Sequence, residues 1–127
     1  MVLATTNHPE KLDPALLDRP SRFDRKYHFD LPGAPERAAY AALWNKELQA
    51  ELGVSAHAVN GVVRATEGFS FAYLKELFLS SMMHWISADG SASMDTIILD
   101  QTTRLRRQLN ETERTRAASA WRLRPRL

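Results

Sequence analysis

The apolar and polar positions divide the chain into a short alternating part and a longer helical part. Met1–Thr6 is a short, mainly β-forming run, which predicts a buried strand that brings Asn7 to one edge of a sheet. Lys26–Pro32 alternates between polar and apolar residues and predicts a second strand. Between them, Asp13 is placed to cap a short helical turn that has Pro14 at its first position. Two parallel strands and a short helix make an incomplete α/β core, which we expect to be marginal unless more sheet covers it.

From residue 34 onward the apolar residues recur with the period of an α-helix. Residues 36–52 place apolar side chains on one face of a predicted helix, and Gly53 supplies its end. Two further helices are predicted to begin at the capping residues Ser55 and Ser70. Three short amphipathic helices cannot bury their apolar faces singly, so we expect them to pack as a small bundle.

The pattern changes twice more towards the end of the chain. Residues 87–93 are small and polar, which is typical of a flexible linker. Beyond them, helical spacing predicts one more amphipathic helix from about Ser93 to Asn110, which either docks on the bundle or pairs with another chain. The last stretch, residues 111–127, is expected to fray and need not have one conformation.

Composition narrows the class of protein. The 127 residues are 44% hydrophobic and 25% charged, as in a soluble globular domain, and no apolar run is long enough to span a bilayer. The absence of cysteine excludes a disulfide framework and a thiolate zinc site, and it favours a reducing compartment without identifying one. The four histidines lack the spacing of metal ligands, so no metal site is predicted in this chain.

The charge is unevenly distributed along the chain. Residues 104–127 hold eight arginines against Glu111 and Glu113, a net charge of +6, whereas residues 1–103 carry a net charge of −4. A basic end is a possible footprint for nucleic acid or for an acidic partner; the alternative, which we favour, is a terminal arm that keeps the chain soluble. Trp121 is the lone aromatic residue there, so the stacking platform expected for single-stranded nucleic acid is missing.

The segment Asp18–Arg25 is the most unusual part of the sequence. It places three arginines and two aspartates around a single aromatic residue, with a proline and a serine that favour a turn. The planar, permanently charged side chains of Arg22 and Arg25 suit the recognition of phosphate or carboxylate. On composition alone, a solvated loop whose arginines pair with the neighbouring aspartates is the alternative.

Three segments taken in order, Ala4–Asn7, Leu12–Leu17 and Arg22–Arg25, resemble the second half of an AAA-type ATPase module. The resemblance implies the C-terminal part of a P-loop NTPase α/β core followed by an α-helical lid. It gives Asn7 the role of sensor 1, the residue that helps to place the attacking water near the terminal phosphate of the nucleotide. It makes Arg22 and Arg25 the arginine fingers, which reach into the nucleotide site of the neighbouring subunit.

The segment Gly68–Leu74 resembles the start of the third helix of an AAA lid, which lies beside the nucleotide. The resemblance implies nucleotide contact for Phe71 and Ala72, and a sensor 2 contact for Lys75 one helical turn further on. The alternative for Lys75 is a solvated lysine that pairs with neighbouring carboxylates. Three further aromatic residues of the helical part are expected to be ordinary core: Trp44, Phe78 and Trp85.

The resemblance and the pattern together give five predicted parts. These are the C-terminal part of the AAA α/β core at residues 1–33, the helical lid at 34–86, a linker at 87–93, an amphipathic helix at 94–110 and a basic tail at 111–127.

The function implied by the resemblance is ATP hydrolysis, with ATP and Mg²⁺, within a homo- or hetero-oligomeric ring of AAA subunits that could act on a protein substrate. The sequence contains neither a phosphate-binding Gly-x-x-x-x-Gly-Lys-Ser/Thr loop nor a strand ending in paired acidic residues, which in an AAA module precede the segments matched here. The chain is therefore not expected to hydrolyse ATP alone. Two alternatives remain: a non-hydrolysing module that binds an AAA partner, and a nucleic-acid-binding protein that uses the basic tail.

Overall fold

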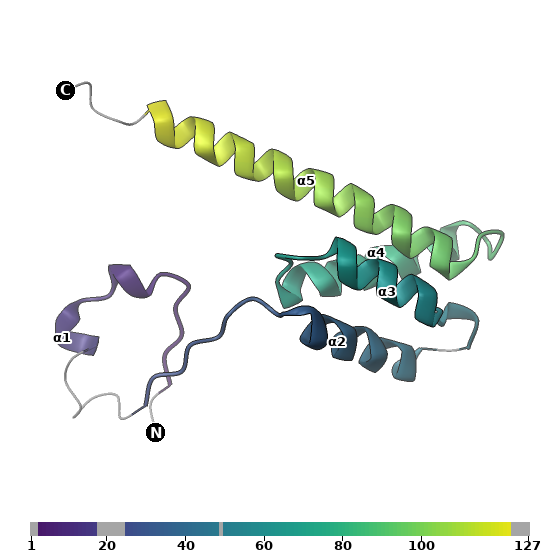
Figure 1. The fold of residues 1–127 in the computed structure, drawn as a ribbon, viewed down its shortest axis with the longest axis horizontal. Coiled ribbons are helices and arrows are strands. Elements are labelled where there is room, and N and C mark those ends of the chain that lie inside the picture. Colours follow the sequence, from purple (N-terminus) through teal and green to yellow (C-terminus); the bar gives the residue numbers. More distant parts are fainter. Residues whose placement is uncertain (1–2, 18–24, 49, 123–127) are drawn as a thin grey trace. The chain divides into compact units, whose positions relative to one another are not determined.

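The computed structural model describes residues 3–17, 25–48 and 50–122, and the described elements are helical (Figure 1). The chain divides into two compact units, Met1–Asp30 and Leu31–Leu127. The elements in chain order are the 3-10 helix η1 (Pro9–Lys11), α1 (Pro14–Leu17), α2 (Ala34–Glu47), the 3-10 helix η2 (Ala50–Leu52), α3 (Ala56–Ala65), α4 (Phe71–Ser87) and α5 (Met94–Arg122).

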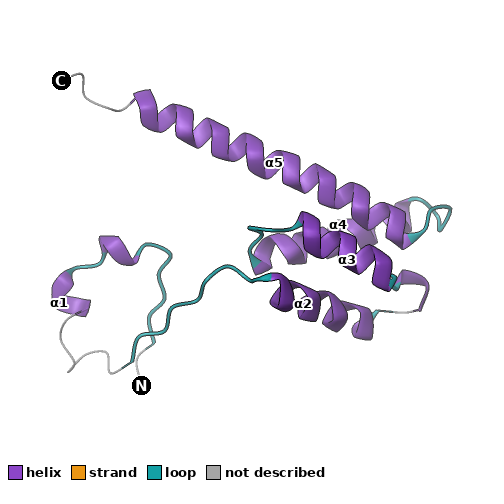
Figure 2. Cartoon of the chain, in the orientation of Figure 1, coloured by secondary structure: helices purple, strands orange, loops and turns teal. Residues whose placement is uncertain are grey.

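The described residues of the first unit form two short helical elements, η1 and α1, and no sheet. The Asp13 side chain accepts a hydrogen bond from the backbone N–H of Ala15 at 2.9 Å, and Pro14 begins α1, so the predicted cap is confirmed. The two predicted strands are wrong for the described residues, in which Figure 2 shows only helices and loops. A strand is stable only when its backbone groups pair with a neighbouring strand, and none is paired here. Leu3 and Phe29 are accordingly 83% and 90% exposed.

The second unit is a four-helix bundle. Helix α5 packs against α3 and α4, and α2 packs against α3. The predicted caps are confirmed, because the Ser55 and Ser70 hydroxyls accept hydrogen bonds from the backbone N–H groups of Ala58 and Tyr73, each at 3.2 Å. The residues buried most completely, and so forming the centre of the core, include Phe69, Leu74, Leu77, Phe78 and Ile98.

The predicted helix over residues 36–52 is divided into α2 and η2. Leu48 is extended, with a ψ of 151°, and ends α2. The Asn45 side chain donates to the Val54 carbonyl at 2.8 Å and accepts from the Val54 N–H at 3.0 Å. This pair of hydrogen bonds ties α2 to the segment before α3, a tertiary contact that helical spacing alone does not reveal.

Helix α5 extends to Arg122, whereas the predicted helix ends at Asn110 and a frayed tail is expected from residue 111. It docks on the bundle through Met94, Ile98 and Leu105, as the first of the two alternatives for this helix expects. Residues 110–119 are all exposed, so packing does not explain their helical form. This stretch contains no glycine or proline and several strong helix formers, which explains why the helix continues. No helix in the described residues combines the length and the apolar character that a membrane span needs.

Replacing Asn45 with alanine is expected to lower the free energy of unfolding by about 1–3 kcal/mol, because it leaves the backbone groups of buried Val54 without partners. Urea denaturation of the chain measures this change. Asn60→Ala, at an exposed position within α3, is the matched control, since it brings the same change in helix propensity; it should stay within about 0.5 kcal/mol of wild type. Equal unfolding midpoints for the two variants would contradict the role given to Asn45.

Candidate functional site

Asn7 and the arginine segment belong to the first unit. Asn7 is exposed in a bend, and the next residue, His8, donates its backbone N–H to the Thr6 hydroxyl at 3.0 Å. Arg25 is exposed and lies in a segment without regular structure, whereas Arg22 lies outside the described residues. A hydrogen bond from its own backbone and a contact with His8 lower the pKa of the Glu10 carboxyl. Asn7, Glu10 and Arg25 are all exposed.

Phe71, Ala72 and Lys75 lie together on the first turns of α4, in the second unit, and all three are exposed. Ser70 caps this end of the helix, and the preceding Gly68 has a φ of +79°, a conformation that favours glycine. Among the described residues no carboxylate forms an ion pair with Lys75.

The Phe71 ring extends an aromatic cluster onto the surface. Phe71 is 48% exposed, and its ring centroid lies 5.4 Å from that of Tyr40 on α2. Tyr40 also contacts Trp44 and Phe78, and these last two rings are stacked at 5.3 Å. Phe78 is buried and Trp85 packs against the core, as expected of core aromatics, so the exposed edge of the cluster is Phe71 with Tyr40 beside it. Sequence analysis missed Tyr40 as a site residue because its position on an apolar helix face is equally typical of core.

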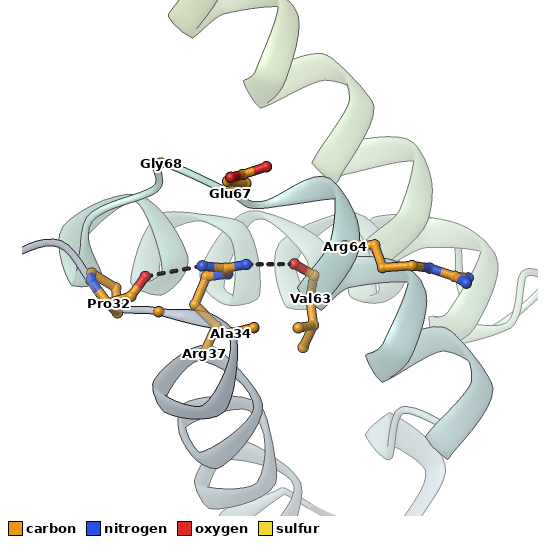
Figure 3. A pocket seen from close by; sticks show the side chains of 8 residues that line it. Pro32, Ala34, Arg37, Val63, Arg64, Glu67 and Gly68 are labelled. Atoms are coloured by element: carbon orange, nitrogen blue, oxygen red, sulfur yellow. Dashed lines mark hydrogen bonds between the residues drawn. The ribbon is translucent and has the colours of Figure 1, made fainter.

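An open hollow of about 560 Å³ lies at the start of α2 and the end of α3, and Gly68 and Glu67 of the loop before α4 are among its lining residues (Figure 3). One lining residue is Arg37, only 7% exposed, which donates to the carbonyls of Pro32 and Val63, each at 2.9 Å. Its Nε is inaccessible and has no hydrogen-bond partner among the described residues. Because the guanidinium is committed to backbone carbonyls, we interpret Arg37 as a structural tie. Arg37 was not predicted as a structural residue, because a cation near the N-terminal end of a helix is unfavourable in isolation.

Comparison with known proteins finds one family model and several relatives that match parts of the chain. The model of the family described as "ATPase family associated with various cellular activities (AAA)" matches residues 1–31. The chain is 48% identical over 79 residues to the ATP-dependent zinc metalloprotease FtsH of Acidothermus cellulolyticus, covering 61% of this chain and 11% of that protein. No solved structure matches the chain significantly.

Two further relatives extend over more of the chain. The FtsH of Hahella chejuensis is 36% identical over 107 residues, which are 78% of this chain and 17% of that protein. The proteasome-activating nucleotidase of Methanosarcina mazei is 33% identical over 88 residues, which are 69% of this chain and 20% of that protein. The chain thus spans a fifth or less of the length of these curated relatives. The family model and the relatives together identify the chain as belonging to the AAA ATPase family.

Proposed function

We propose that this chain contributes three parts of an ATPase that binds and hydrolyses ATP within an oligomeric ring. Asn7 is the sensor that places the attacking water, Arg22 and Arg25 are fingers that act on the nucleotide of a neighbouring subunit, and α2–α4 form the lid. The observation that carries the proposal is the family match over residues 1–31, which include Asn7 and both arginines. The helical bundle follows this segment directly in the chain.

The chemistry of phosphoryl transfer suits these residue types. Charge on the transferred phosphoryl group is spread over its equatorial oxygens, and a cation supplied by a neighbouring subunit stabilises it. Arg25 is exposed, as a group that acts outside its own subunit must be. The amide of Asn7 offers both a donor and an acceptor with which to hold a water molecule.

The start of α4 fits the base and phosphates of ATP. The exposed Phe71 ring, backed by Tyr40, offers a flat apolar surface for adenine. Ala72 is small and exposed, so the nucleotide can approach the backbone, and the Lys75 ammonium lies one turn further along the helix. In the described residues no three His, Cys, Asp or Glu side chains converge, so Mg²⁺ would be held by the P-loop and acidic-strand motifs that this sequence lacks.

The test of this proposal begins with the polypeptide that the source cells make from this gene, captured with an antibody to the bundle. Its mass, its assembly state and its rate of ATP hydrolysis are measured together. A ring-forming polypeptide that hydrolyses ATP supports the proposal. A polypeptide that hydrolyses none, yet changes the rate of a partner ATPase, supports the non-hydrolysing alternative instead.

In that polypeptide, Phe71→Ala is expected to weaken ATP binding by about 1–3 kcal/mol, which is roughly a 5- to 150-fold rise in Kd, because adenine loses its stacking surface. Titration with a fluorescent ATP analogue measures the change. Leu79→Ala, at another exposed apolar position of α4, is the control and should bind like wild type. An unchanged Kd for Phe71→Ala would remove this ring from the nucleotide site.

A further inference from the structure

Arg106 on α5 makes a set of contacts that the proposed site leaves unexplained. Its Nε and Nη2 donate to the Ala65 carbonyl at 3.1 and 2.7 Å, and Nη2 also donates to the Glu67 carbonyl. Its guanidinium carbon lies 4.8 Å from the centroid of the Phe69 ring. One side chain of α5 therefore contacts the last residue of α3 and two residues of the loop that follows, some forty residues away in the sequence.

The loop that Arg106 holds leads directly into the first turn of α4. Ala65 ends α3, and its carbonyl belongs to the negative end of that helix, where a cation is favourable. Phe69 is fully buried, and its ring contacts Tyr73 on its way into α4 at a centroid distance of 5.7 Å. In the chain, Phe71 and Ala72 lie between Phe69 and Tyr73, whose rings contact each other. The position of Phe71 and Ala72 therefore depends on the conformation of the loop.

We propose that Arg106 is a positioning residue for the nucleotide-contact turn at Phe71–Ala72, and that it couples α5 to nucleotide binding. This inference rests on the proposed function. Arg106 does not touch the nucleotide itself; it acts by fixing the Ala65 and Glu67 carbonyls and the Phe69 ring. Nucleotide affinity therefore depends on how α5 is seated, although α5 follows the turn by more than twenty residues.

The contacts require an arginine. The planar fork of the guanidinium presents donors to two carbonyls while its face lies against an aromatic ring. A lysine at this position offers one compact ammonium, which can reach one carbonyl but cannot reproduce the fork and the stacking together. A lysine variant should therefore restore only part of the effect, which distinguishes positioning from a simple requirement for positive charge.

The experiment compares R106Q and R106K with R104Q, a matched change two residues earlier on α5. Arg104 is exposed and pairs with Asp100 on its own helix, away from the loop. Hydrogen exchange of the amides at residues 67–73 is measured in the 127-residue chain, and the KM for ATP and kcat are measured in the polypeptide from the source gene. Urea denaturation of each variant establishes that it is folded.

We expect R106Q to speed exchange of the loop amides and to raise the KM for ATP, each by about 10-fold, with kcat changed less than about 2-fold. R106K should lie between R106Q and wild type, and R104Q should match wild type. If folded R106Q matches R104Q in exchange and KM while wild type binds ATP, the positioning role is overturned. If the wild-type polypeptide binds no ATP, the proposed function is overturned instead. The role of Arg106 in nucleotide binding is then overturned as well.

Discussion

Alanine at both Arg22 and Arg25 is expected to lower ATP hydrolysis by the proposed ring about 10³- to 10⁵-fold, which corresponds to roughly 4–7 kcal/mol of transition-state stabilisation. The reason is that the charge developing on the transferred phosphoryl group loses its cations, while the groups that bind ground-state ATP stay in place. A steady-state hydrolysis assay should show a lowered kcat with an almost unchanged Kd for ATP. Arg19→Ala, in the same segment but outside the Arg22–Arg25 motif, is the control and should keep the wild-type rate.

The action of these arginines on a neighbouring subunit is tested by mixing two inactive variants. Subunits with R22A and R25A retain Asn7 but lack fingers, and N7A subunits retain fingers but lack the sensor. In a mixed ring, the fingers of an N7A subunit can serve the nucleotide of a finger-deficient neighbour, so mixing should recover part of the activity. If mixed rings assemble without any recovery, the arginines do not act across the subunit interface.

The largest effect on stability is expected from Phe78→Ala, which should lower the free energy of unfolding of the bundle by about 3–5 kcal/mol. Phe78 is 1% exposed, and its ring stacks on Trp44 and meets the edge of Tyr40, so truncation leaves a cavity between α2 and α4. A domain of this size is stable by only about 5–15 kcal/mol, so the loss is a large part of the total.

Urea denaturation followed by tryptophan fluorescence measures this loss, because Trp44 lies against the altered ring. Phe29→Ala removes the same side chain from a position that is 90% exposed in the first unit, and its unfolding midpoint should be unchanged. A loss below about 1 kcal/mol for Phe78→Ala would show that the bundle closes over the cavity and that the aromatic stack contributes little.

The features predictable from sequence are those that local chemistry determines. The caps at Asp13, Ser55 and Ser70 were predicted because a capping side chain bonds to the backbone only two or three residues away. The break after α2 was missed because it depends on a bond between Asn45 and Val54 across a turn. The strands were wrong because a strand depends on a partner, and the alternation of residues does not reveal whether the partner is present.

The residues of the candidate site also fall into those that the sequence predicted and those that only the structure revealed. Phe71, Ala72 and Lys75 came from a resemblance to a short motif, and the structure gathers them on one exposed end of α4. Arg37 and Arg106 were missed because each bonds to backbone carbonyls, which every residue carries and no sequence pattern marks. Their partners lie 26 and 41 residues away in the chain, so only the folded structure reveals the contacts.

The length of the exposed part of α5 determines the position and the rotation of the helical residues that follow it. From residue 110 to 119 every residue of the helix is exposed, so this stretch contributes no buried residue to the core. Each residue inserted there would advance the following residues by about 1.5 Å and turn them by about 100° around the helix axis. A single insertion or deletion in this stretch would therefore shift and rotate the last described turn of α5 relative to the bundle.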